Sequence, residues 1–240
     1  MKTFSLAVAA AVGMLATQAH SATTLLLDPF TEFQLVADRP GPGRTNASQV
    51  SGSDIIGGFR DLRVTNTVSD DPTDDNDTVV RIRQGRMTFN NTAGSRGTAT
   101  LTYDGNDDAT SFDPTGLGGM DFLIGDAPRF QIDLAASDLN VYVQITVTDM
   151  DRRESIFEVT RGPGATGGAD FALFNGDADF SNVGGLQIFV SSEPTDDSVD
   201  SIFVGPLVVA ANLPPVPLPA SGMLLLAGLG AMAALRRRKG

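Results

Sequence analysis

Apolar and polar residues alternate with a period of two along several stretches of this chain, and that alternation restricts its fold more than any other feature. The clearest stretch runs from Val141 to Thr148, where valine or isoleucine occupies every second position. Because successive side chains of a strand point to opposite faces, such a stretch predicts a half-buried β-strand. Further strand-like runs lie at 25–27, 32–36, 61–65, 80–83, 86–90, 98–103, 130–134, 155–159, 171–174, 186–190 and 201–209.

The composition also disfavours helices. Twenty-five of the 29 acidic residues are aspartates, which favour turns and caps and are poor inside helices. Clusters of Gly, Asp, Asn and Pro separate the strand-like runs, and no run shows a sustained apolar period of 3.6 residues. Residues 23–211 are therefore predicted to form one all-β domain, an antiparallel sandwich or barrel.

Two residue types are almost absent, and their absence excludes several chemistries. The chain has no cysteine, so it forms no disulfide and offers no thiolate nucleophile or metal ligand. The single histidine, His20, lies near the N-terminus. A domain without histidine can support neither a Ser-His-Asp triad nor an imidazole-ligated zinc site.

Charge is distributed unevenly. Five of the 17 basic residues lie in the two terminal segments, which leaves 12 arginines and all 29 acidic residues in the body, a net charge of −17. Such a surface repels nucleic acid and anionic lipid, so we expect no nucleic-acid partner.

The first 22 residues have the features of a cleavable signal peptide. Lys2 precedes a short apolar run that ends at Leu15, and small residues follow it. Candidate cleavage points follow Ala19, Ser21 and Ala22. Signal peptidase and the secretion machinery are the partners that this segment predicts.

The C-terminus shows a second ordered series of features. A proline-rich stretch at 212–221 precedes an apolar run at 222–235, and basic residues at 236–240 close the chain. We predict a linker, a short transmembrane helix and a basic stop that stays in the cytoplasm, so that the body faces outward. The five predicted segments are thus the signal peptide (1–22), the β-sandwich domain (23–211), the linker (212–221), the helix (222–235) and the stop (236–240).

This tail resembles the PEP-CTERM class of bacterial sorting signals in the variant spelled VPLPA. The residues that carry the resemblance are Val216, Pro217, Leu218, Pro219 and Ala220, followed by Arg236, Arg237 and Arg238. The resemblance implies recognition by an exosortase-like sorting enzyme and delivery to the cell surface or extracellular matrix. The chain would be held in the inner membrane by its helix until processing, and exopolysaccharide is a further implied partner.

The second half of the body resembles galactose-binding-like jelly rolls. The resemblance rests on Leu117 to Asp121, on an Asn-Val pair at Asn182 that opens one strand, and on an Asp-Ser-Ile run at Asp200 that opens the last. It implies a jelly-roll-like β-sandwich and, by analogy, permits carbohydrate binding.

Acidic loops are the candidate metal sites. Calcium takes six to eight oxygen ligands from Asp, Asn and backbone carbonyls in a tight loop. The candidate ligands are Asp74, Asp75, Asn76 and Asp77 in one loop and Asp104, Asp107 and Asp108 in another. Neither loop has the EF-hand pattern, and solvated acidic turns are the alternative interpretation. Structural calcium is the only cofactor that the sequence indicates.

Three functions remain open. The first is a non-enzymatic surface protein of the envelope or exopolysaccharide matrix, and the second is an extracellular carbohydrate-binding module stabilised by calcium. Sugar sites stack rings on Trp or Tyr, but the chain has no Trp and only two tyrosines. The third is a glycan-active enzyme that uses Asp149 and Asp151 as its carboxylate pair, although Arg152 and Arg153 favour ordinary ion pairing there.

Overall fold

A computed structural model of the chain describes residues 22–38, 45–67, 77–92, 95–137, 140–162, 168–192 and 200–212. All of these ranges belong to one compact unit, Ala22–Asn212. Apart from the terminal residues Ala22 and Asn212, the predicted signal peptide, linker, sorting motif, hydrophobic helix and basic stop lie outside the described residues. Within the part that is described, no helix is long and apolar enough to cross a membrane.

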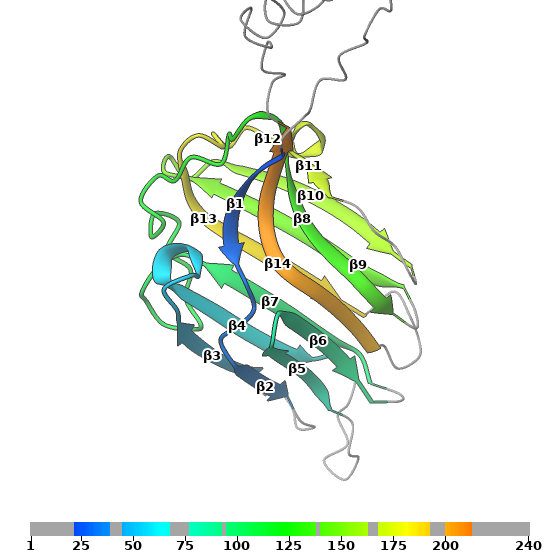
Figure 1. Cartoon of the computed structure of the whole chain (residues 1–240). Coiled ribbons are helices and arrows are strands. Elements are labelled where there is room, and N and C mark those ends of the chain that lie inside the picture. The colour runs from blue at the N-terminus through cyan, green and yellow to red at the C-terminus, as the bar shows by residue number, and fades with distance from the viewer. Residues whose placement is uncertain are drawn as a thin grey trace, which may run out of the picture. The chain divides into compact units, whose positions relative to one another are not determined.

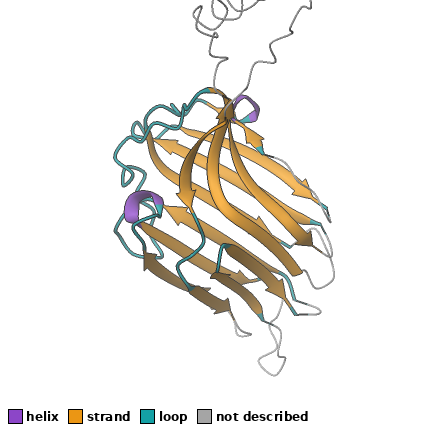
Figure 2. Ribbon diagram, viewed as in Figure 1, coloured by secondary structure: helices purple, strands orange, loops and turns teal. Residues whose placement is uncertain are grey.

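The described chain is almost entirely strand and turn (Figure 2). The strands are β1 (Ala22–Asp28), β2 (Gln34–Asp38), β3 (Thr45–Ser51), β4 (Phe59–Asn66), β5 (Thr78–Arg83), β6 (Arg86–Asn91), β7 (Gly97–Tyr103), β8 (Asp126–Ser137), β9 (Val141–Asp149), β10 (Glu154–Arg161), β11 (Ala169–Asp170), β12 (Asn175–Gly176), β13 (Val183–Ser191) and β14 (Asp200–Asn212). Two short 3-10 turns, η1 (Ile56–Gly58) and η2 (Phe171–Leu173), interrupt the strand pattern.

The strands form two antiparallel sheets that pack face to face (Figure 1). The first sheet has the order β11-β8-β14-β6-β5-β2, and β1 pairs with β14 beside this path. The second sheet has the order β12-β10-β9-β13-β7-β4-β3. The chain changes sheet repeatedly, for example from β6 to β7, from β7 to β8 and from β8 to β9. The predicted all-β antiparallel sandwich is confirmed, and its jelly-roll character stays a prediction.

The core lies between the two sheets and follows the sequence alternation. Val141, Val143, Ile145 and Val147 of β9 are buried, while the residues between them face outward. Apolar surface removed from water in this way contributes roughly 25 cal/mol per Å² and is the main stabilising term of the sandwich.

One group of polar residues is buried within this core and ties the two sheets together. The Arg60 guanidinium donates to Asp28 Oδ2 at 2.7 Å, and both side chains are fully buried. Tyr103 donates its hydroxyl to the same oxygen at 2.9 Å. Since Asp28 belongs to the first sheet and the other two residues to the second, the network fixes the end of β1 against β4 and β7.

One local prediction was wrong, and one of the longer strands was not predicted. The run 171–174 was expected as a strand, but Phe171–Leu173 is the turn η2. The strand β3, Thr45–Ser51, was not expected at all. Both strand openings of the second resemblance are confirmed, because β13 begins at Val183 and β14 at Asp200.

Candidate functional site: a polar sheet face beside a carboxylate cluster

The outer face of the second sheet carries rows of polar side chains. The antiparallel register places outward residues of neighbouring strands directly opposite one another. One row is Gln49, Asp61, Thr102, Gln187, Thr146 and Ile156. The adjacent row is Ala47, Arg63, Thr100, Phe189, Gln144 and Glu158. The same alternation that builds the core therefore builds a face of hydroxyls and amides.

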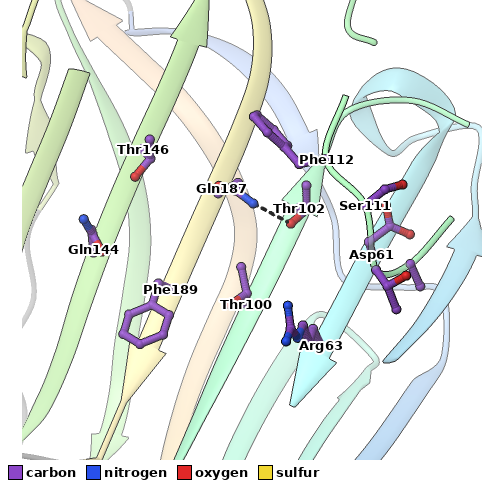
Figure 3. Close-up of a pocket in the computed structure, with 12 residues that line it drawn as sticks. Asp61, Arg63, Thr100, Thr102, Ser111, Phe112, Gln144, Thr146, Gln187 and Phe189 are labelled. Carbon is purple, nitrogen blue, oxygen red and sulfur yellow. Dashed lines mark hydrogen bonds between the residues drawn. The ribbon is translucent and has the colours of Figure 1, made fainter. Parts of the chain in front are cut away.

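A pocket of about 310 Å³ lies on this face (Figure 3). Its floor comes from the two rows on β4, β7, β13 and β9, and Gln187 donates to the Thr102 hydroxyl at 3.3 Å. Its wall comes from the loop between β7 and β8, through Thr110, Ser111 and Phe112. Short hydroxyl and amide groups around a concavity of this size can bind a polar ligand with many hydroxyls.

Aromatic rings are also present on this face. Phe189 lies on the pocket floor and Phe112 on its wall, and both are only half-buried. Tyr142 packs edge to face against Phe189 with ring centroids 6.1 Å apart, and its hydroxyl donates to Glu158 at 2.5 Å. Burial, together with this hydrogen bond, raises the pKa of Tyr142 to about 12. The expectation that sugar rings stack on Trp or Tyr did not consider these two half-buried phenylalanine rings.

Asp61, which lines the pocket, is also one of three carboxylates that meet. Asp61, Asp104 and Asp107 each place one oxygen within 4.8 Å of the others. Alternation explains the placement, because Arg60 and Tyr103 point into the core while Asp61 faces outward and Asp104 follows the end of β7. Asp61 and Asp104 are only 2% and 1% exposed, so their charges are shielded from water.

The electrostatics of this cluster are unfavourable without a counter-charge. Burial raises the pKa of Asp61 to about 6, with the charges of Asp107 and Asp108 adding to the shift and the nearby Gln49 amide opposing it. Burial likewise raises the pKa of Asp104 to about 7, against a backbone hydrogen bond from Asp113 that lowers it. The cluster is therefore the most perturbed described group of acids on this face.

Of the seven predicted calcium ligands, the structure brings two together. Asp104 and Asp107 belong to the cluster, and Asp61 joins them from β4. Asp108 does not, because its Oδ1 accepts the backbone N–H groups of Thr110 and Ser111. Asp77 lies before β5 and is not part of the cluster, while Asp74, Asp75 and Asn76 lie outside the described residues.

The predicted preference for ion pairing at Asp149 is also seen. Its two carboxylate oxygens accept the backbone N–H groups of Asp151, Arg153 and Asp179, each at 2.9 Å. The Arg153 guanidinium completes the set at 2.8 Å. Burial alone would raise the pKa of Asp149, but these hydrogen bonds and the guanidinium outweigh it and hold the pKa below its usual value. Asp149 is thus a structural anchor for the turn after β9.

A second hollow, of about 440 Å³, lies on the outer face of the β5–β6 hairpin of the other sheet. Arg81, Arg83 and Arg86 line it. It is cationic, in contrast with the acidic body.

Comparison with known proteins identifies the tail. Residues 215–239 match the family model of the PEP-CTERM protein-sorting motif, which confirms the resemblance of the VPLPA segment. The chain therefore carries a PEP-CTERM sorting signal, which implies export, sorting at the membrane and processing by exosortase-type machinery. The match covers the tail and none of the sandwich. No curated protein matches the chain.

Solved structures show only a distant likeness to the sandwich. A family 11 carbohydrate-binding module of a cellulosomal cellulase from Clostridium thermocellum is 11% identical, with a TM-score of 0.36, over 79% of this chain and 95% of that one. An agarase is 7% identical, with a TM-score of 0.37, over 64% of this chain and 23% of that one. A xylanase from Clostridium thermocellum is 9% identical, with a TM-score of 0.25, over 80% of this chain and 28% of that one. Likeness at this level carries no argument about ligand or activity.

Proposed function

We propose that this chain is a non-catalytic surface protein that is exported, processed at its tail and displayed to bind extracellular polysaccharide through the outer face of its second sheet. The observation that carries the binding proposal is the pocket of hydroxyl and amide side chains with two half-buried phenylalanine rings. The sorting signal supplies the address, since a protein sorted to the surface meets polysaccharide outside the cell.

The chemistry of the face supports a carbohydrate ligand. Sugar hydroxyls need closely spaced donors and acceptors, and Thr102, Thr146 and Gln187 present both kinds on adjacent strands. The apolar face of a sugar ring needs a flat apolar partner, which Phe189 and Phe112 provide. A sheet face is also rigid, so that little conformational entropy is lost on binding.

The absence of a free carboxylate pair on the pocket floor favours binding over turnover. Asp149 is held by four donors, and the exposed side chain of Asp151 lies in the following turn. Asp61, which lines the pocket, belongs to the cluster, and Glu158 in the adjacent row accepts the Tyr142 hydroxyl. In this proposal the protein therefore binds polysaccharide without cleaving it.

The proposal is tested by measuring affinity for polysaccharides, including the exopolysaccharide of the native cells, with the protein purified from those cells. Replacing Phe189 and Gln187 by alanine removes a stacking surface and an amide from the floor while leaving the core side of β13 intact. We expect the double variant to bind at least about tenfold more weakly, a loss of about 1.4 kcal/mol.

The β5–β6 hollow provides the matched control. A variant with Arg83→Gln and Arg86→Gln changes the other sheet and should bind neutral polysaccharide as the wild type does. Loss of binding only in this control would move the ligand site to the arginine face. Release of reducing sugar ends during incubation, lost in an Asp61→Asn variant, would replace the binding proposal by an enzymatic one.

A further inference from the structure

The carboxylates of the cluster have unsatisfied oxygens at the point where they meet. Both oxygens of Asp61, Oδ1 of Asp104 and Oδ1 of Asp107 are buried and make no hydrogen bond. Buried polar atoms are paired in the great majority of cases, and an unpaired charged one is costly. Three carboxylates that meet within 4.8 Å with four unpaired oxygens thus indicate a missing partner.

The remaining oxygens of the cluster show how the unsatisfied ones are oriented. Asp104 Oδ2 accepts the backbone N–H of Asp113 at 2.8 Å. Asp107 Oδ2 accepts the hydroxyl of Ser111 at 2.8 Å. The loop between β7 and β8 therefore fixes one oxygen of each of these two carboxylates and leaves the other without a hydrogen bond. Second-layer hydrogen bonds of this kind orient metal ligands in proteins.

No basic side chain compensates these charges. Among the described residues, no salt bridge involves Asp61, Asp104 or Asp107. Arg63, two residues along on the same face as Asp61, is exposed and makes no ion pair with them. Asp61 is 98% buried, and one of its oxygens lies within 4.8 Å of Asp104 and Asp107. Neither of its oxygens makes a hydrogen bond, not even to the nearby Gln49 amide, and this points to a bound cation rather than to a solvated acidic turn.

We propose that Asp61, Asp104 and Asp107 bind one calcium ion. The donor set is oxygen only, which suits a hard cation and not zinc or copper. Oxygens bound to one calcium ion at 2.3–2.6 Å lie no more than about 5 Å apart, and the three carboxylates meet that limit at 4.8 Å. One oxygen from each of the three carboxylates leaves room for water to complete the six to eight ligands of calcium.

The ion would join two segments that are distant in the sequence. Asp61 lies on β4, whereas Asp104 and Asp107 begin the loop whose residues Thr110 to Phe112 form the pocket wall. Calcium would thus hold that wall against the sheet. This proposal does not depend on the proposed polysaccharide binding, because the cluster should bind the cation whether or not a glycan is bound.

The test is calorimetric titration and thermal unfolding of the full chain, stripped of cations by chelation, with and without calcium chloride at neutral pH. We expect one ion per chain and a melting temperature raised by about 3–10 °C at millimolar calcium. Asp61→Asn and Asp107→Asn should each abolish the calcium response. Asp177→Asn, which removes the same charge from an exposed carboxylate, should keep it.

The variants also separate loss of the site from loss of folding. Without calcium, Asp61→Asn should melt at or above the wild-type temperature, because the substitution removes repulsion and keeps the side-chain volume. The proposal is overturned if wild type shows neither binding heat nor a thermal shift, or if calcium binding survives both cluster variants. A larger shift with magnesium than with calcium would also overturn the assignment. Polysaccharide affinity is measured separately, so a failure of that proposal is distinguishable.

Discussion

Asp28, Asp149 and Asp61 are all buried, but only the first two have hydrogen-bond partners. Asp28 receives Arg60, Tyr103 and the backbone N–H of Phe30. Asp149 receives three backbone N–H groups and a guanidinium. A buried charge is tolerated only when it is paired. Asp28 and Asp149 therefore stabilise the fold, whereas Asp61 is the residue that we expect to bind a ligand.

Removing Asp28 should be among the most damaging single changes in the core. Asp28→Ala leaves the Arg60 guanidinium charged and buried, and we expect the free energy of unfolding to fall by about 3–5 kcal/mol. Urea denaturation followed by circular dichroism measures it. Asp177→Ala, which truncates an exposed carboxylate, should change stability by no more than about 0.5 kcal/mol. Equal losses in the two variants would contradict the role given to the buried network.

Asp149 should make stability depend on acidity. Its pKa is lowered in the folded state, so the folded protein binds fewer protons there than the unfolded chain, whose aspartates titrate near 3.9. The stabilisation is therefore present above about pH 4 and is lost as the pH falls through the lower folded pKa.

The corresponding variant is Asp149→Asn. At pH 7 it should be less stable than the wild type by about 1.5–3 kcal/mol, since hydrogen bonds to a charged acceptor are replaced by weaker ones. The gap should narrow between pH 4 and pH 2, as measured by urea unfolding at each pH. A gap that stays constant over this range would show that the carboxylate charge of Asp149 does not stabilise the fold.

At the scale of elements, the loop between β7 and β8 is positioned by close backbone contact. A Cβ atom at Gly116 would lie 1.5 Å from the carbonyl oxygen of Asp104, a clash that only backbone movement can relieve. Gly118 has a positive φ of 68°, but a Cβ there would meet no atom within 4 Å. Glycine is thus required at position 116 because no space exists for a side chain, and at position 118 only because of the positive φ angle.

Alanine variants of the two glycines should therefore differ. Gly116→Ala should destabilise the protein by about 3 kcal/mol and displace Asp104 from the cluster, whereas Gly118→Ala should cost about 1 kcal/mol. Thermal unfolding gives the stabilities, and the thermal shift with calcium reports on the cluster. If Gly116→Ala retained the full calcium shift, the loop contact would not position the site.

The sequence predicted the strands in which buried apolar residues alternate with polar ones. It did not predict the elements that lack this alternation, such as β3 and the turn η2. Strand β3 lies at the edge of its sheet and is mostly polar, so it carries no apolar alternation to detect. The run 171–174 has the aromatic composition of a strand. Its two phenylalanines instead pack together, with ring centroids 6.0 Å apart, because the three-residue period of a 3-10 turn aligns them.

The candidate site was predictable only in part, because it depends on the register in which distant strands pair. Asp104 and Asp107 are near in sequence and could be recognised as a loop pair. Asp61 joins them because β4 pairs with β7 so that Asp61 faces Thr102, and no local pattern encodes that register. The polar rows of the sheet face depend on the same long-range pairing, which involves six strands.

At the scale of the whole molecule, the first and last strands of the domain lie side by side. Ala22 pairs with Asn212, so the first and last strands of the domain are neighbours. The sorting signal at 215–239 begins just beyond the last strand. Processing at both ends would therefore leave β1 and β14 paired and the core intact.

Four consecutive basic residues close the tail, and they should be needed for sorting. Replacing Arg236, Arg237 and Arg238 by glutamine removes most of the positive charge that is predicted to retain the stop in the cytoplasm. We expect the variant to lose surface delivery while its sandwich melts at the wild-type temperature. Cell fractionation and thermal unfolding measure the two properties, and normal delivery of the variant would contradict this role of the arginines.

The account is tested most directly by the intact mass of the protein recovered from each fraction of its native cells. A surface-sorted protein should be found outside the cytoplasmic membrane without its leader, residues 1–22, and without the segment that follows the VPLPA motif. Extra mass on the new C-terminus would identify the molecule to which it is joined. Recovery only in the inner membrane, with the entire tail retained, would contradict surface sorting and leave a plain membrane anchor.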